Sequence, residues 1–381
     1  GPEYLLPKPI DPRILVYESA AVAQQAIKEG VARLTVTDEP YRERLTIRLG
    51  TGRETMRGLI MKARHENPRV VFSEGSSETV LRACAILIDE NIAQPILVGN
   101  EDEVRKVMEH LDLDLGGVRI IDPFQSSRFE AYVEEYFKIR RRRGVMHAEA
   151  VKRLRKRDYF SALMLHSGDV DMLFAGVSTH YVESLRTILE VIGPAPGIRR
   201  VSSHHMILLH KDVYFLADCA VNIDPTAEEL AEIALLTAST VRSLGIEPRV
   251  AMLSFSTYGS VSHPLARKIR RATEIAKSLE PDLIIDGEIQ LAIAVNNTLR
   301  HKYFPFCELE GNANVLIFPD LQSGNLALNL LQYIGEAVSV GPILMGTRLP
   351  AHLRQYGATV EEVVNLTTLG VVEAGAFRRQ D

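Results

Sequence analysis

A polar loop in this chain has the residue types that bind phosphate groups. Residues 178–181 (Ser-Thr-His-Tyr) follow the apolar run 172–177 and precede a helical stretch that carries Arg186. Hydroxyls and backbone N–H groups at a strand end and a helix N-terminus are suited to anionic oxygen. A structural role is the alternative: Ser178 or Thr179 would cap the helix, and Arg186 would form a surface ion pair. The candidate contacts are Ser178, Thr179, His180 and Arg186.

Two further polar loops follow apolar runs in the same way. The loop after residues 250–255 could place several donors on phosphate, and turn formation is its alternative. In the loop after residues 315–318, Pro319 and Gly324 are expected to shape the backbone. At another strand end, Glu288 could line the cleft or cap the next helix, and capping is the favoured expectation. The candidate contacts in these two loops are Ser256, Thr257, Tyr258, Asp320, Ser323 and Asn325.

Basic runs and histidines complete the set of reactive side chains. Residues 140–143 are four arginines that should end a helix, where their charge complements the helix dipole. Residues 152–157 are expected to form an exposed helical face. His204 and His205 are neighbours in an expected strand and point to opposite faces, so they cannot chelate one metal ion together. No metal site is expected in these residues.

Composition narrows the class of protein. The 381 residues carry 44 basic and 49 acidic side chains, a net charge of −5, which disfavours general nucleic-acid binding. Three cysteines without paired spacing are expected to be reduced and buried. No apolar run approaches the roughly 20 residues that span a bilayer, and no signal peptide is recognised. We expect a cytoplasmic protein with no membrane partner, and a chain that is an excised fragment because it begins without Met.

The elements that must position these side chains alternate between strands and helices. Short runs rich in Val, Ile and Leu indicate strands buried on both faces, and helical stretches between them predict parallel sheets covered on both sides. Residues 201–209 and 213–222 read as an antiparallel hairpin, so mixed sheets are expected. Residues 192–199 (Ile-Gly-Pro-Ala-Pro-Gly-Ile-Arg) are the best hinge candidate. No Gly-x-Gly-x-x-Gly fingerprint for a dinucleotide follows a strand.

Residues 341–365 resemble the closing motif of phosphate acetyltransferases. In that family a Ser-Arg pair precedes the glycine that is Gly357 here, and it helps to transfer acetyl groups to or from coenzyme A. Gln355 and Tyr356 stand in place of the pair, and Glu362 stands where active members carry Asp. An amide cannot act as a nucleophile and a phenol brings no fixed positive charge. The resemblance therefore implies an acyl-CoA site that is used for sensing.

The resemblance covers roughly residues 68–375, through motifs at 69–75, 215–234, 252–260 and 312–325 in the family's order. Residues 4–13, 21–32 and 41–45 look like the last segment of a bacterial malic enzyme catalytic domain. This layout is similar to that of hybrid, NADP-type malic enzymes, whose C-terminal domain passes inhibition by acetyl-CoA to the catalytic domain. It implies two mixed-sheet α/β lobes with a cleft between them, as in phosphate acetyltransferases and isopropylmalate dehydrogenases, preceded by a helical connector. The implied boundaries are 1–67 for the malic enzyme tail and linker, 68–196 plus 349–381 for the first lobe, and 197–348 for the second.

The same resemblance implies ligands, partners and further site residues. Acetyl-CoA is the expected allosteric ligand, and NADP and a divalent metal are expected only in a catalytic domain outside this chain. A homodimer through the second lobe is expected, with apolar helices at 226–244 and 263–279 as its interface. A working phosphate acetyltransferase and a purely structural oligomerisation module are the alternatives. The further residues implied to line the cleft are Arg140, Met345, Arg348 and Tyr356, with Arg140 and Arg186 on the phosphates.

Overall fold

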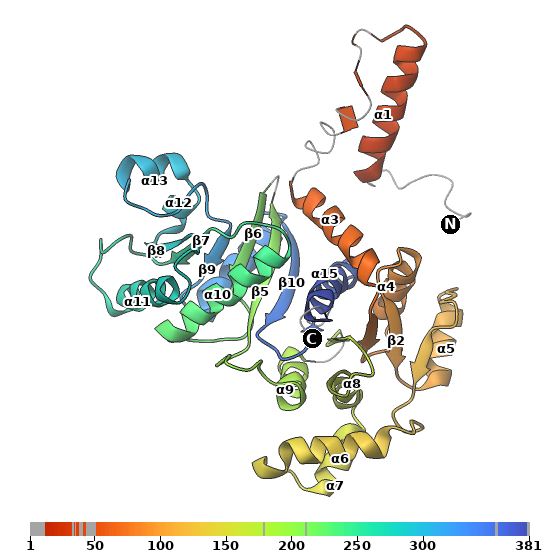
Figure 1. Cartoon of the computed structure of the whole chain (residues 1–381). Helices are drawn as coiled ribbons and strands as arrows, with labels where there is room; N and C mark the ends of the chain where they lie inside the picture. The colour runs from red at the N-terminus through yellow and green to blue at the C-terminus, as the bar shows by residue number, and fades with distance from the viewer. Residues whose placement is uncertain are drawn as a thin grey trace.

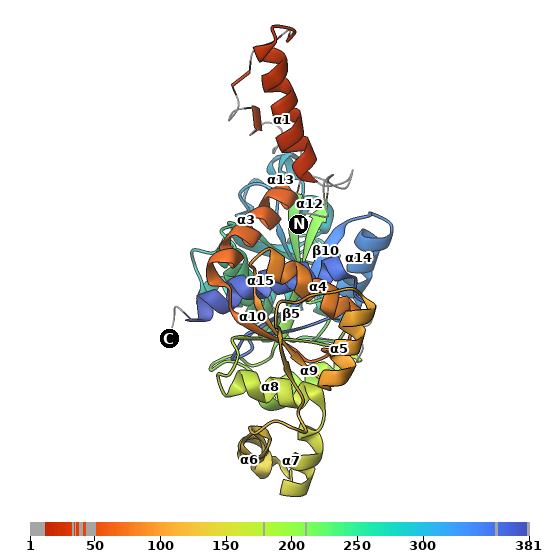
Figure 2. The same ribbon diagram turned by 90° about the vertical axis from the view of Figure 1, so that its right-hand side faces the viewer.

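The computed structural model describes residues 12–32, 34, 36–37, 41–42, 51–177, 180–209, 212–354 and 357–378. It confirms the predicted α/β architecture of two lobes, each built on one sheet (Figure 1). The helices with described bounds before the first strand are α1 (Pro12–Lys28), which projects from the body in Figure 2, and α3 (Thr51–Glu66). Within the described ranges no helix is long and apolar enough to cross a membrane.

The first sheet has five strands in the order β11-β4-β1-β2-β3, and every pair in it is parallel. The expectation of a mixed sheet is wrong for this lobe, because each connection between its strands crosses over through helices. Its strands are β1 (Arg69–Phe72), β2 (Gln94–Val98), β3 (Arg119–Ile121), β4 (Met172–Ala175) and β11 (Ala351–Leu353).

Helices cover both faces of this sheet because its strands are apolar on both sides. Val70 and Phe72 of β1 pack into one hydrophobic cluster with α4, whereas Val71 packs into a second cluster with α8. This arrangement explains why the strands read as continuous apolar runs. The helices of the lobe are α4 (Glu78–Asp89), α5 (Glu101–His110), α6 (Phe129–Arg140), α7 (His147–Leu154), α8 (Arg157–His166) and α9 (Tyr181–Val191), with the 3₁₀ turn η1 (Arg141–Arg143).

The second sheet has six strands in the order β10-β5-β6-β9-β7-β8. The predicted hairpin is present: β5 and β6 are antiparallel, with His204 opposite Ala217 and Leu209 opposite Asp212. Strand β10 pairs antiparallel with β5, and the remaining pairs are parallel, so this sheet is mixed as expected. The strands are β5 (Ser202–Leu209), β6 (Asp212–Ala217), β7 (Val250–Leu253), β8 (Ile285–Ile289), β9 (Val315–Ile317) and β10 (Val338–Met345).

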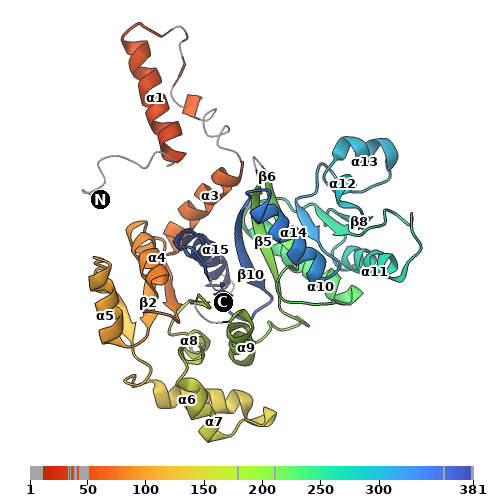
Figure 3. The same cartoon turned by 180° about the vertical axis from the view of Figure 1, so that it is seen from behind.

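One face of the second sheet is covered by α10 (Ala227–Ser243) and α11 (Pro264–Leu279). The other face carries α12 (Leu291–Ala294), α13 (Asn297–Tyr303) and α14 (Leu321–Tyr333), which Figure 3 shows from behind. Helix α10 begins at a capping box in which Thr226 accepts from the N–H of Glu229 and the Glu229 side chain accepts from the N–H of Thr226.

The C-terminal helix α15 (Val360–Arg378) lies between the two lobes. In Figure 1 it runs between β10 of the second sheet and α4 of the first, with α3 alongside. Side chains of α15, α3 and both sheets belong to one continuous hydrophobic cluster. The two lobes therefore share part of their core.

The expected hinge pairs with a distant segment. Ala195 N–H donates to the Gly346 carbonyl (2.8 Å), and Arg348 N–H donates to the Gly193 carbonyl (3.0 Å). Both segments join residues of the first sheet to residues of the second. The division of the lobes at residues 196/197 and 348/349 stays our proposal.

Candidate functional site

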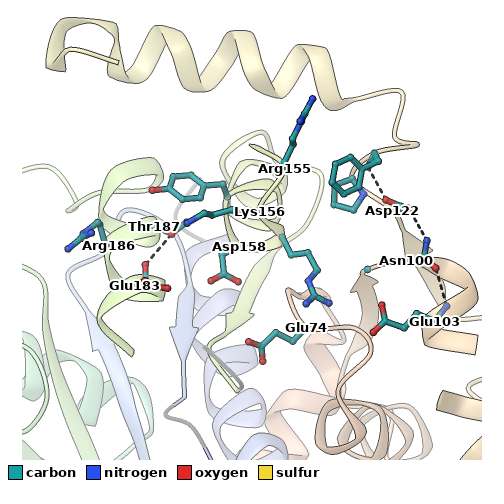
Figure 4. Close-up of a pocket in the computed structure, with 15 residues that line it drawn as sticks. Glu74, Asn100, Glu103, Asp122, Arg155, Lys156, Asp158, Glu183, Arg186 and Thr187 are labelled. Carbon is teal, nitrogen blue, oxygen red and sulfur yellow. Dashed lines mark hydrogen bonds between the residues drawn. The ribbon is translucent and has the colours of Figure 1, made fainter. Parts of the chain in front are cut away.

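The carboxyl edge of the first sheet opens into a pocket of about 520 Å³ (Figure 4). The segments that follow β1, β2 and β3 form one wall of this pocket, and α8 and α9 form the other. In parallel α/β sheets this edge collects strand-end loops and helix N-termini, so it is the usual place for a ligand. Of the predicted site residues, Arg186 lines this pocket.

Basic side chains without ion-pair partners surround the pocket. Lys156, Arg157 and Arg186 line it, are exposed, and make no ion pair within the described ranges. Arg157 makes one long hydrogen bond, from Nη1 to Ser76 Oγ (3.4 Å). The alternative role of Arg186 as a surface ion-pair partner is therefore not realised among the described residues. Free guanidinium and ammonium groups at a pocket are suited to phosphate oxygens.

Two carboxylates point into the same pocket from opposite walls. Glu74 follows β1, and Asp158 lies in the first turn of α8 (Figure 4). Burial raises the pKa of Asp158, the Glu74 charge adds to this rise, and a hydrogen bond from Ser184 Oγ (3.1 Å) opposes it. The interior of the pocket is thus acidic and its surround is basic. This combination suits a ligand that carries both an anionic end and hydrogen-bond donors.

Arg140 belongs to a neighbouring buried cluster. Its Nη2 lies 3.9 Å from Glu190 Oε1, and Glu190 accepts hydrogen bonds from the hydroxyls of Tyr136 (2.9 Å) and Tyr159 (2.8 Å). Burial alone would raise the pKa of Glu190, but these hydroxyls and the Arg153 charge hold it below its ordinary value. Tyr159 also lines the pocket. Arg140 therefore borders the pocket through Tyr159.

The start of α9 meets the second lobe. Tyr181 is half-buried, and burial and the nearby Asp218 charge raise its pKa, while its hydroxyl has no partner in the described part of the chain. Asp218 follows β6 and holds the loop 218–222, accepting from Ser203 Oγ (2.6 Å) and from the Asn222 side chain (2.7 Å). His180, the residue before Tyr181, is exposed. This junction lies beside residues 178–179, which are outside the described ranges.

The closing motif is anchored by Arg354. Its Nη1 donates to the Gly341 carbonyl of β10, and its Nη2 pairs with Glu362 of α15. Glu362 Oε2 also accepts from Thr359 N–H (2.9 Å) at the start of α15. Arg354 thus ties the first sheet, the second sheet and α15 together, immediately before Gln355. Gln355 and Tyr356 themselves lie outside the described residues.

A family model described as phosphate acetyl/butaryl transferase matches residues 54–371. The chain belongs to this family. It is 38% identical over 326 residues to a phosphate acetyltransferase of Thermoanaerobacterium thermosaccharolyticum, which covers 84% of this chain and 99% of that protein. A solved phosphotransacetylase from Streptococcus pyogenes superposes with a TM-score of 0.81 at 36% identity, covering 84% of this chain and 98% of that one.

The chain is also similar to malic enzymes along nearly its whole length. It is 37% identical over 380 residues to the NADP-dependent malic enzyme of Escherichia coli, which covers 98% of this chain but 50% of that protein. The chain therefore spans about half the length of the malic enzymes that it matches. Its residues before 54, which lie outside the transferase family model, are included in this match.

The hydroxyls predicted on the loop after β7 are engaged within the second lobe. Ser256 Oγ accepts from Val261 N–H (3.1 Å), Thr257 Oγ1 accepts from Gln290 N–H (3.1 Å), and Tyr258 Oη donates to Asp286 (2.9 Å). Glu288 holds this loop from below, accepting from Gly259 N–H (2.7 Å) and from Arg270. The expectation that Glu288 caps the next helix is wrong, because its carboxylate is buried in the sheet and turned toward the loop.

The third predicted loop forms the start of α14. Asp320 caps the helix by accepting from Ser323 N–H (2.8 Å), and Ser323 Oγ donates to the Asp320 carbonyl (3.0 Å). Asn325 lies one turn along and reaches the Cys219 carbonyl (3.4 Å). Gly324 was expected to shape the backbone, but it lies within α14, and what requires glycine there is close approach: a Cβ would lie 2.5 Å from the Asp218 carbonyl oxygen. These residues line the second lobe beside the Asp218 loop.

The remaining predicted residues are dispersed. Met345 is buried in the hydrophobic cluster at the end of β10. Arg348 is exposed, and its guanidinium lies 3.1 Å from His166 Nδ1 at the end of α8. Ser178, Thr179 and Tyr356 lie outside the described residues. No group of three or more metal-ligating side chains occurs in the part of the chain that the structure describes.

Sequence reasoning missed several pocket residues. Glu74, Asn100 and Asp122 each stand just after a strand of the first sheet, a signal that could have been read from the apolar runs before them. Lys156 lies in the basic run 152–157, which was interpreted as an exposed helical face, and Asp158 follows this run directly. Both side chains line the pocket because α8 begins there.

Proposed function

We propose that this chain is a non-catalytic, acetyl-CoA-sensing regulatory domain of a hybrid malic enzyme. The match to malic enzymes over 98% of the chain and half of their length supports a catalytic domain in cis, which would carry NADP and a divalent metal. Binding of acetyl-CoA would inhibit malate oxidation by favouring one state of the assembly over another.

The observation that carries the loss of catalysis is the pairing of Arg354 with Glu362. Glu362 stands where active transferases hold an aspartate, and here its carboxylate is bound to Arg354 and to the N-terminus of α15. Both oxygens of this carboxylate are therefore already engaged by partners within the chain. Arg354 is the cation closest in sequence to the missing arginine, but its charge is neutralised by Glu362 and it is buried. Loss of an acid–base group costs about 10²–10⁴ in rate, and loss of an electrostatic stabiliser costs about 10²–10³.

The pocket supports binding of the anionic half of acetyl-CoA. Lys156 and Arg186 offer positive charge without an ion-pair partner among the described residues, and Arg157 adds a cation whose charge also acts on Asp158. The chain as a whole is acidic, so attraction depends on this local cluster. The acyl end would extend toward Tyr181, whose hydroxyl has no partner among the described residues. Binding should therefore weaken as salt concentration rises.

A working phosphate acetyltransferase is the second candidate. The observation in its favour is that Arg186, the position that contacts phosphate in the family, is present, exposed and unpaired among the described residues. A thiol-release assay with acetyl-CoA and inorganic phosphate separates the two candidates. Turnover at a rate ordinary for enzymes, above about 1 per second, would establish the transferase and refute the sensing function.

Acetyl-CoA binding is measured by titration calorimetry on the chain and on two variants. Arg186→Ala should weaken binding about tenfold, because one charge-assisted hydrogen bond is worth about 1.5 kcal/mol. Arg267→Ala is the matched control, since Arg267 is an exposed arginine on α11 in the other lobe. Equal affinity of Arg186→Ala and the unmodified chain would show that the site lies elsewhere.

We also propose a homodimer through the second lobe. On α10 the side chains of Leu230, Ala234 and Ala238 pack within the chain, so this stripe is not available to the interface. Helix α14 carries an apolar stripe instead, on the outer face of the second sheet (Figure 3). Its four side chains, each more than half exposed, are Leu326, Leu330, Tyr333 and Ile334. Leu330→Glu with Tyr333→Lys should convert a dimer to a monomer in light scattering, and a chain that is already monomeric at micromolar concentration would refute the dimer.

A further inference from the structure

Helix α3 lies across both lobes although it precedes both in sequence. Its residues Leu59 and Ala63 are buried in the hydrophobic cluster that joins the two sheets, where α3 packs along α15. Figures 1 and 2 both place α3 against α15. The helix is therefore part of the contact between the lobes. It also connects the residues that precede it in the sequence to both lobes.

Two basic side chains of α3 each cap a helix, one in each lobe. Lys62 Nζ donates to the carbonyl of Leu244 (3.2 Å), the C-cap residue of α10 in the second lobe. Arg64 Nε donates to the carbonyl of Glu90 (2.9 Å), the C-cap residue of α4 in the first lobe. Carbonyls at helix C-termini have no intrahelical donor and carry partial negative charge, so both contacts are favourable.

The end of α3 is seated closely on α15. Arg378 Nη2 donates to the Glu66 carbonyl (3.0 Å), and the Glu66 side chain lies directly over Gly375. A Cβ at residue 375 would approach Glu66 Cδ to 2.2 Å. A side chain at this position must therefore displace the Glu66 carboxylate, while the bond from Arg378 to the Glu66 carbonyl holds the end of α3 on α15.

We propose that α3 is a brace that fixes the relative position of the two lobes through its caps on α4 and α10. A ligand that changes the angle between the lobes moves the α4 and α10 termini relative to each other, and α3 cannot satisfy both caps without moving. This motion is passed to the residues that precede α3. The second part of the proposal rests on the proposed regulatory function, whereas the brace itself does not.

The brace is tested by measuring the distance between spin labels on the two lobes of this chain. Labels at Glu109→Cys of α5 and Thr298→Cys of α13, in a Cys307→Ser background, report the lobe positions; both labelled side chains are exposed. The brace variant is Lys62→Met with Arg64→Met. Its matched control is Lys106→Met with Arg267→Met, an exposed lysine and an exposed arginine away from the interlobe contact.

The brace variant should shift the mean label distance by about 2 Å or more, the scale of small interdomain movements, or broaden its distribution, and the control should do neither. Two single variants guard against a folding defect. Lys62→Met and Arg64→Met each keep one of the two caps, so each should change the label distance less than the double variant does. Unchanged distances in the brace variant and in both single variants would overturn the proposal.

The transmission step is tested in the longer protein with its catalytic domain. The brace variant should bind acetyl-CoA with an affinity within about twofold of that of the unmodified protein. It should require an acetyl-CoA concentration about fivefold higher for half-inhibition, a factor at the low end of allosteric coupling. Inhibition that stays unchanged while the label distance shifts would refute transmission through α3. Absence of acetyl-CoA binding to the unmodified protein would instead refute the proposed function, and the distance measurements would still decide whether α3 is a brace.

Discussion

Replacing Arg354 by methionine removes a guanidinium that joins both lobes to α15. The side chain is 11% exposed, and methionine fills the space of its apolar stem. The Gly341 carbonyl loses its donor, and Glu362 loses its ion pair. Gly341 lies where the pairing register of β10 with β5 shifts, so no neighbouring strand residue replaces the lost donor.

The expected cost is the sum of three effects. A buried carbonyl left without a donor costs about 1–3 kcal/mol. The Glu362 side chain is 29% exposed and can be hydrated again, so loss of its ion pair adds about 1 kcal/mol. Removal of Arg354 Nε, which is buried without a partner among the described residues, offsets about 1 kcal/mol. Arg354→Met should therefore lower the free energy of unfolding by about 2 kcal/mol.

Urea-induced unfolding followed by circular dichroism measures this change. Arg267→Met, at an exposed position, should change stability by less than about 0.5 kcal/mol. A double variant with Glu362→Gln separates the ion pair from the carbonyl, because the coupling between the two substitutions reports the pair alone. An Arg354→Met protein with the stability of the control would refute the view that this guanidinium holds the lobes together.

The following changes should also alter stability measurably. Burial lowers the pKa of His204 and His205 from the ordinary value of 6.5 to about 3, with smaller contributions from His352 and Arg354. Between these two pKa values the histidines of the unfolded chain bind protons and those of the folded chain do not, so the free energy of unfolding falls as the pH falls below about 6.5. The expected loss is about 1 kcal/mol for each histidine between about pH 7 and about pH 5.5. Urea midpoints at the two pH values measure this slope, which His205→Asn should flatten; an unchanged slope would show that His205 does not cause it. Gly324→Ala should lower the free energy of unfolding by about 1–3 kcal/mol, because the new Cβ meets the rigid Asp218 carbonyl. Gly58→Ala is its control: residue 58 of α3 has open space around it, so this change should be neutral or stabilise by up to about 1 kcal/mol. Equal urea midpoints for these two variants would contradict the close approach of α14 to the Asp218 loop.

The fold could be predicted because its signals are local. Strands β1, β4, β7 and β9 are apolar runs of three or four residues, and burial on both faces is what produces such runs. The β5–β6 hairpin was predicted from two adjacent strand-like segments with a short connection. The parallel pairing of the whole first sheet was not predicted, since strand order and direction depend on crossovers that no single segment encodes.

The candidate site was predicted less completely, for a different physical reason. Arg186 was found because a basic residue follows a strand–loop–helix unit, and the structure places it at the pocket. Ser256 and Thr257 have the residue types of a phosphate loop, but they bond to Glu288 of the neighbouring strand β8 and to Gln290, which directly follows it. Whether a hydroxyl is free or already bonded depends on which strand lies next to it, and this is settled by sheet order.

The sequence by itself determined the elements, the α/β class, the family resemblance and the replacement of Ser-Arg by Gln355-Tyr356. These properties depend on residue type and on spacing along the chain. Only the tertiary structure decided that Arg354 pairs with Glu362, that α15 and α3 lie between the lobes, and that Lys62 and Arg64 cap helices of different lobes. Each of these contacts joins elements that are far apart in the sequence. They come together because the apolar faces of the two sheets pack around one shared helix. Burial of these apolar faces brings the polar side chains at their edges together. The hydrophobic free energy of this burial does not depend on which polar side chains meet there.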